Sequence, residues 1–68
     1  MDMNRIGKFE MLRLVNEFDA ALIQLFGVNM LDAAITRYEA LGAVNELDCP
    51  RTAAQVYGLR RGLNLQAA

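Results

Sequence analysis

One seam of large apolar residues constrains the fold of this chain more than any other feature. Its members are separated by four, three, four and three residues: Met11, Val15, Phe18, Leu22 and Leu25. This is the a/d spacing of a helix that packs lengthwise against another helix. The segment from residue 3 to residue 26 has no proline and one glycine, so it predicts a single helix of about 36 Å. Such a helix is longer than the rest of a 68-residue chain can cover.

The size of the chain predicts that it needs support beyond its own core. Residues 1–68 make one small domain, and a domain of this size buries only about 60% of the surface that its unfolded chain exposes. Disulfides, metals and oligomerisation are the usual supplements. Cys49 is the only cysteine and histidine is absent, which excludes an internal disulfide and a four-ligand zinc site. Oligomerisation remains, and the apolar share of 54% agrees with it. We therefore expect a homodimer with the five seam residues in the contact.

Turn and cap residues divide the chain into three predicted helices. Gly27 favours the left-handed backbone that ends a helix, Asn29 is a good N-cap, and Pro50 fits the first turn of a helix. The predicted helices and the frayed tail that follows them are residues 3–26, 30–44, 51–63 and 64–68. The expected fold is all-α, with a long first helix, a second helix antiparallel to it and a short third helix. We expect this three-helix arrangement to assemble as a homodimeric helical bundle.

The hydropathy pattern predicts a cytoplasmic protein. No apolar run approaches the roughly 18 residues of a membrane span, and the N-terminal residues lack the apolar region of a signal peptide. One cysteine without a second fits a reducing compartment. We expect no association with a membrane.

The side chains available for chemistry argue against an enzyme. Histidine, the commonest general base and metal ligand, is absent, so Cys49 lacks the partner that activates a thiol nucleophile. The glycines match no phosphate-binding loop, and the acidic residues fall away from the apolar faces. We expect no catalytic residue, no metal, no cofactor and no small-molecule substrate. We also expect Cys49 to be dispensable.

Charge is distributed unevenly along the chain, although the net charge is only −1. Residues 1–50 carry four basic and eight acidic side chains, whereas residues 51–68 carry three arginines and no acid. A partner's acidic patch or a phosphate backbone would use such a positive end, although solvated arginines near a helix C-terminus are the simpler explanation. The candidate contacts on this segment are Arg51, Gln55, Arg60 and Arg61. We expect Arg60 and Arg61 to matter more for binding than for folding.

A local motif resembles the helix-turn-helix of bacterial winged-helix regulators. It consists of the strings LFGVN at residues 25–29 and AITRYEALGAV at residues 34–44, about a third of the chain. The resemblance implies a recognition helix at residues 30–42, with Thr36 and Arg37 as candidate DNA contacts. An ordinary amphipathic helix after a glycine turn explains the same residues.

Two functional hypotheses follow. The leading one is a small non-enzymatic regulatory or adaptor protein that acts through protein–protein interaction, as an inhibitor, chaperone or assembly factor, and works as a homodimer. The alternative is a helix-turn-helix transcription regulator that binds DNA through the helix at residues 30–44 or through residues 51–61.

Overall fold

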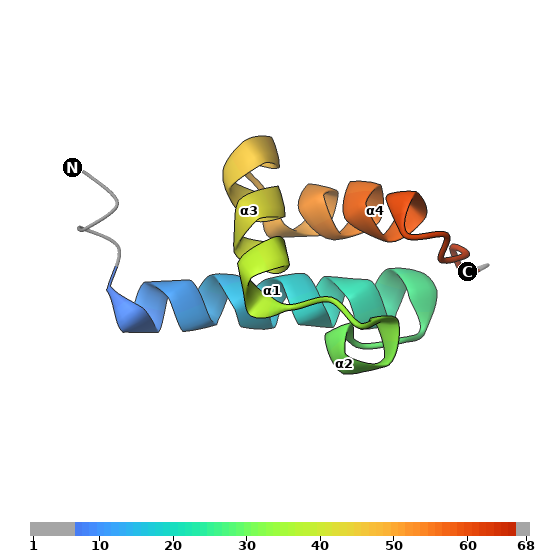
Figure 1. The fold of residues 1–68 in the computed structure, drawn as a ribbon, viewed down its shortest axis with the longest axis horizontal. Helices are drawn as coiled ribbons and strands as arrows, with labels where there is room; N and C mark the ends of the chain where they lie inside the picture. The colour runs from blue at the N-terminus through green and yellow to red at the C-terminus, as the bar shows by residue number, and fades with distance from the viewer. Residues whose placement is uncertain (1–6, 67–68) are drawn as a thin grey trace.

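The computed structural model describes residues 7–66, and this part of the chain is helical with no strand. Its four helices are α1 (Lys8–Phe26), α2 (Met30–Ala33), α3 (Arg37–Leu47) and α4 (Pro50–Arg60). Figure 1 shows α4 lying alongside α1 and running in the same direction, while α3 crosses both steeply and α2 lies at the C-terminal end of α1. The all-α prediction is confirmed for the described residues. The antiparallel three-helix arrangement is wrong.

The first helix ends where the sequence predicts and begins later. Gly27 adopts left-handed backbone with φ of 76°, and its N–H donates to the carbonyl of Ile23. At the other end, Gly7 has extended backbone and precedes the first helical residue. A helix that runs unbroken from residue 3 is therefore wrong, and residues 3–6 themselves lie outside the described residues.

The second predicted helix, residues 30–44, is broken into α2 and α3. Asn29 caps α2 as predicted, since its side chain accepts the N–H of Asp32 at 2.7 Å. Ala34 then turns to left-handed backbone with φ of 59°, which costs about 1–2 kcal/mol in a non-glycine residue. Two local features offset that cost: Ile35 is buried, and Thr36 begins α3 with a capping box.

The capping box is a reciprocal pair of hydrogen bonds at the start of α3. The Thr36 hydroxyl accepts the N–H of Glu39 at 3.1 Å, and the Glu39 carboxylate accepts the N–H of Thr36 at 2.7 Å. Such a pair satisfies two amides that a helix start leaves without partners. The string Thr-x-x-Glu at residues 36–39 is its sequence signature, and it marks a second helix start, at Arg37, inside the segment that was predicted to be one helix.

The end of the chain is more ordered than predicted. Pro50 is the first residue of α4, as expected, but the helix ends at Arg60 and not at residue 63. The chain then turns at Gly62 and returns to α1. The backbone N–H of Gln66 donates to the carbonyl of Leu25, and its side chain donates to that of Phe26. Residues 64–66 are thus held against α1 instead of fraying, whereas residues 67–68 lie outside the described residues.

The core lies where α1, α3 and α4 meet. Phe18 and Leu22 are its largest fully buried side chains, and the ring of Phe18 meets the edge of Tyr57 with centroids 6.4 Å apart. Small residues let the helices approach closely, above all Gly58, which lies against the ring of Phe26. The buried apolar set is Val15, Phe18, Ala21, Leu22, Phe26, Met30, Ile35, Ala40, Ala43, Val44, Ala53 and Ala54.

Candidate protein-interaction surface

Most of the apolar seam on α1 is covered by the chain itself. Phe18 and Leu22 have no exposed surface, Val15 is buried, and Leu25 packs half-buried against the same core. A side chain without exposed surface cannot contact a second copy in this conformation. Of the five residues predicted to form the interface, Met11 alone keeps substantial exposure, at 37%. Any interface on this side of α1 must therefore use its N-terminal half.

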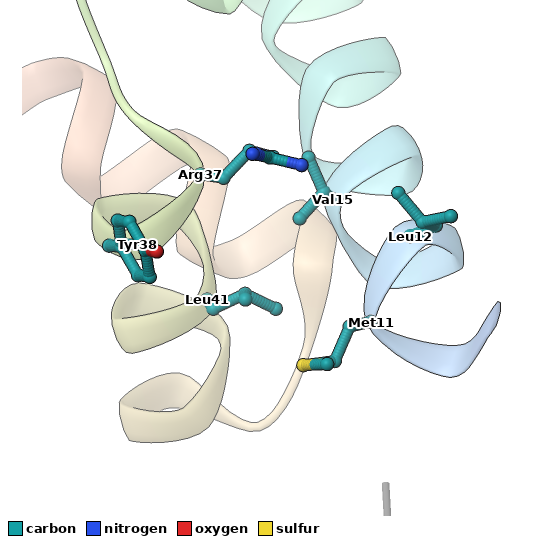
Figure 2. A pocket seen from close by; sticks show the side chains of 6 residues that line it. All are labelled: Met11, Leu12, Val15, Arg37, Tyr38 and Leu41. Atoms are coloured by element: carbon teal, nitrogen blue, oxygen red, sulfur yellow. The ribbon is translucent and has the colours of Figure 1, made fainter. Parts of the chain in front are cut away.

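That half of α1 borders an apolar hollow, because α3 crosses α1 without filling the space between them. The hollow encloses about 380 Å³, and its lining residues are Met11, Leu12, Val15, Arg37, Tyr38 and Leu41. Figure 2 shows Met11 and Leu41 directed toward each other from α1 and α3, while the Arg37 side chain reaches across toward Val15. The lining is apolar except for one guanidinium and one phenol.

The hollow continues along α3 into a second one of about 270 Å³. Met11 and Leu41 line both hollows, so the two are adjacent. The remaining lining residues of the second are Leu14, Val44, Asn45, Asp48 and Pro50. We call the two hollows together the α1–α3 groove. It carries Arg37 at the beginning of α3 and Asp48 just after its end.

Large apolar side chains stand exposed in and beside the groove. Tyr38 is 84% exposed and Leu12 is 47% exposed, and both line the first hollow. Single exposed apolar residues are normal on a protein surface, but contiguous clusters mark interaction sites. Aromatic side chains contribute strongly to protein–protein interfaces. The groove with its exposed Tyr38 ring therefore has the character of a protein-binding surface.

The predicted basic contacts on α4 do not converge on one surface. Arg51 donates to the side chain of Gln24 at 3.0 Å, whereas Arg61 lies at the other end of α4, about 15 Å away along the helix. Gln55 and Arg60 are exposed. This arrangement differs from the concentrated basic stripe that contacts a nucleic-acid backbone.

Arg61 has a structural role that its position in the sequence did not indicate. Its guanidinium donates to the carbonyls of Ala33 and Ala34 at 3.1 and 2.9 Å, where α2 ends in left-handed backbone. It also lies 3.5 Å from the Glu39 carboxylate. Arg61 thus ties the end of α4 to the link between α2 and α3. The expectation that it matters more for binding than for folding does not fit these contacts.

Glu39 is the centre of this connection. Its carboxylate accepts the hydroxyl of Tyr57 at 2.9 Å as well as the N–H of Thr36. The hydrogen bonds from Thr36 and then Tyr57 lower the pKa of the Glu39 carboxyl, with a further contribution from Arg61. The same carboxylate raises the pKa of the Tyr57 phenol. The sequence carried the Thr36–Glu39 signature, but the pairing with Tyr57 and Arg61 depends on the fold.

The recognition helix that the helix-turn-helix resemblance implies is not continuous in the structure. Residues 30–42 contain the break at Ala34, so no continuous helix presents them to a groove of DNA. The Thr36 side chain is engaged in the capping box. Arg37 is exposed at the start of α3 and lines the α1–α3 groove, beside apolar side chains instead of other cations.

Chemistry is sparse in the part of the chain that the structure describes. No cluster of three or more His, Cys, Asp or Glu side chains is placed to hold a metal ion there. Cys49 is exposed at the N-cap of α4, where the amide and hydroxyl of Thr52 lower the pKa of its thiol. Among the described helices, none has the length and apolar character needed to cross a membrane.

No family model, no curated protein and no solved structure matches the chain.

Proposed function

We propose that this chain is a small non-enzymatic regulatory or adaptor protein that acts by binding protein through the α1–α3 groove, and that it works as a homodimer. The observation that carries the proposal is the groove itself, an apolar hollow of about 380 Å³ lined in part by Tyr38, which is 84% exposed. Water contact at such side chains is unfavourable, and burying apolar surface contributes about 25 cal/mol per Å². A protein partner would remove this surface from water.

The size of the chain supports the homodimer. Below about 70–80 residues a single core supplies only a few kcal/mol of stability, and association with another chain is one of the common supplements. A cytoplasmic location, expected from the single cysteine, belongs to the same proposal.

Site-specific photocrosslinking in the native host tests the proposal. Tyr38→p-benzoylphenylalanine places the crosslinker at the groove, and Gln55→p-benzoylphenylalanine places it on the exposed side of α4 as a matched control. Both positions are exposed, so neither change disturbs the core. We expect a defined protein adduct from position 38, either with the chain itself or with another protein, and none from position 55. The same adducts from both positions, or none from position 38, would contradict the proposal.

A further inference from the structure

We propose that the occupant of the α1–α3 groove is a second copy of this chain, bound face to face about a two-fold axis. Met11 and Leu41 lie near the axis, and Arg37 of each copy faces the Asp48 carboxylate of the other. This inference rests on the proposed function in one respect, namely that the groove binds protein.

The two ends of the groove carry opposite charges. Arg37 lines the first hollow and Asp48 lines the second, while Met11 and Leu41 line both and so occupy the middle. Arg37 is the first residue of α3 and Asp48 follows its last, a separation of about 16 Å along the helix axis. The groove thus has a positive end, an apolar middle and a negative end.

A two-fold axis through the middle of the groove makes this surface complementary to itself. In a two-fold interface the same patch contacts its own copy, so residue i of one chain meets residue j of the other and the reverse. The two-fold axis makes the groove of the second copy run in the opposite direction. Each Arg37 then lies opposite an Asp48 of the other copy, and the two apolar middles meet. The opposite, parallel arrangement would place like charges together, which is unfavourable.

Both charged groups are available for such a contact. The ion pairs among the described side chains join Arg13 to Glu10 and Glu17, and Arg61 to Glu39. Arg37 and Asp48 belong to none of these pairs, and both are exposed. Charges placed this way at the rim of an interface fix orientation and suppress wrong pairings more than they add affinity.

The border of the groove supplies the apolar contact area that a second copy needs. Tyr38 and Leu12 line the first hollow and are 84% and 47% exposed, so face-to-face contact brings both side chains of each copy to the interface. Aromatic side chains bury about 150–250 Å² each when fully covered. The two Tyr38 side chains around an apolar centre form the kind of core that a small dimer interface requires.

Charge exchange at residues 37 and 48 tests the inference by sedimentation equilibrium. Arg37→Asp alone sets two carboxylates against each other at both ends of the dimer, and Asp48→Arg alone sets two guanidinium groups together. We expect each variant to weaken dimerisation at least about tenfold at low salt, since like charges then face each other at both ends of the groove. The double variant restores both pairs with inverted sign, so it should dimerise as the wild type does.

A mixture of the two single variants tests whether residues 37 and 48 contact the other copy. In the proposed register a heterodimer of Arg37→Asp with Asp48→Arg joins opposite charges at both ends: one end pairs the two unchanged residues, and the other end pairs the two introduced ones. Equimolar mixing should therefore restore the dimer that neither variant forms alone. Arg60→Asp, an exposed change on α4, is the control and should leave dimerisation unchanged.

Circular dichroism confirms that each variant keeps its helices. If the Asp48→Arg change at this left-handed position lowers helicity, the neutral variants Asp48→Asn and Arg37→Gln are used in place of the charge reversals. Each should weaken the dimer, because it removes one charge of every pair without creating repulsion.

The outcomes separate this inference from the proposed function. A dimer that is indifferent to both single variants, or a mixture that stays monomeric, would overturn the inference. A chain that remains monomeric at millimolar concentration would overturn it too. In that case photocrosslinks from position 38 to a different protein would still support the groove as a binding surface, whereas their absence would remove the proposed function itself.

Discussion

Replacement of Gly58 by alanine should destabilise the protein, even though alanine is the better helix former. Gly58 lies within α4, and a Cβ atom built on it would fall 2.5 Å from Cζ of Phe26 and closer still to the neighbouring ring carbon. Phe26 is itself buried at the C-terminal end of α1. The ring can move away only by displacing other core side chains, so the helices must shift apart or the ring must leave its rotamer.

The magnitude follows from two opposing contributions. Glycine in a helix interior is about 1 kcal/mol less favourable than alanine, whereas overpacking a core costs typically about 1–3 kcal/mol. Because the overlap with Phe26 is severe, we expect the second contribution to win and the free energy of unfolding to fall by about 1–2 kcal/mol. Gly42→Ala is the matched control, since a Cβ atom at this mid-helix glycine of α3 meets nothing within 4 Å. It should raise the free energy of unfolding by up to about 1 kcal/mol.

Urea and thermal denaturation, followed by circular dichroism at one fixed protein concentration, measure both changes. The propensity gain is common to the two variants, so their difference reports the contact with Phe26. A change of about 1 kcal/mol corresponds to roughly 4–8 °C in Tm for a domain of this size. Gly58→Ala should lower the free energy of unfolding by less in a Phe26→Leu background than in the wild type, because the smaller leucine side chain leaves room for the added methyl group. A Gly58→Ala variant as stable as Gly42→Ala would refute the close packing of α4 on α1.

Three further outcomes test other parts of the structure. Arg61→Ala should lower the free energy of unfolding by about 1 kcal/mol, since it removes hydrogen bonds to two carbonyls. The control Arg60→Ala should change the free energy of unfolding by no more than about 0.5 kcal/mol. If urea denaturation shows a larger loss for Arg60→Ala than for Arg61→Ala, the role assigned to Arg61 is contradicted. The Glu39 pKa is lower in the folded state, so the stability that Glu39 contributes is present above its unfolded pKa of about 4.3 and is lost as the pH falls through the folded value. Tyr57→Phe removes one cause of that lowered pKa and should make the acid-induced loss shallower; equal slopes for variant and wild type would count against the hydrogen bond. Cys49→Ser should keep stability within about 1 kcal/mol and leave the photocrosslink from position 38 intact, and a lost crosslink with normal helicity would reveal a chemical role for the thiol.

Local signals in the sequence predicted several element boundaries. Gly27 at the end of α1, Asn29 at the start of α2 and Pro50 at the start of α4 all stand where the sequence placed them. Each acts through its own backbone preference or its own side chain, so no knowledge of the rest of the fold is needed to recognise it.

The break between α2 and α3 has a different origin. Ala34 carries no breaking preference, and Ile35 continues the apolar pattern of a helix. The chain leaves the helix there because Ile35 is buried and because Arg61, far along the sequence, binds the carbonyls of Ala33 and Ala34. Tertiary contacts override local propensity in this way, and the Thr-x-x-Glu string was the one local indication of the new helix start.

The candidate surface could be predicted only in part. Periodicity shows that one face of α1 is apolar, but it does not show which element covers that face. In the structure α3 and α4 cover Phe18 and Leu22, and only the N-terminal half of α1, around Met11, is left for another protein. The contribution of Tyr38 and Leu41 depends on the steep crossing of α3, which the sequence does not specify.

Methionine methyl NMR across a dilution series tests the central claim most directly. Met11 lies in the α1–α3 groove and Met30 lies in the core, so the two methyl groups report the proposed interface and the interior of the same molecule. Loss of a signal in Met11→Leu assigns the first, and loss of a signal in Met30→Leu assigns the second. If a second copy occupies the groove, dilution from millimolar to low micromolar concentration will shift or broaden the Met11 signal and leave that of Met30 in place. A Met11 signal that stays unchanged while sedimentation shows the dimer dissociating would place the interface elsewhere and contradict the claim.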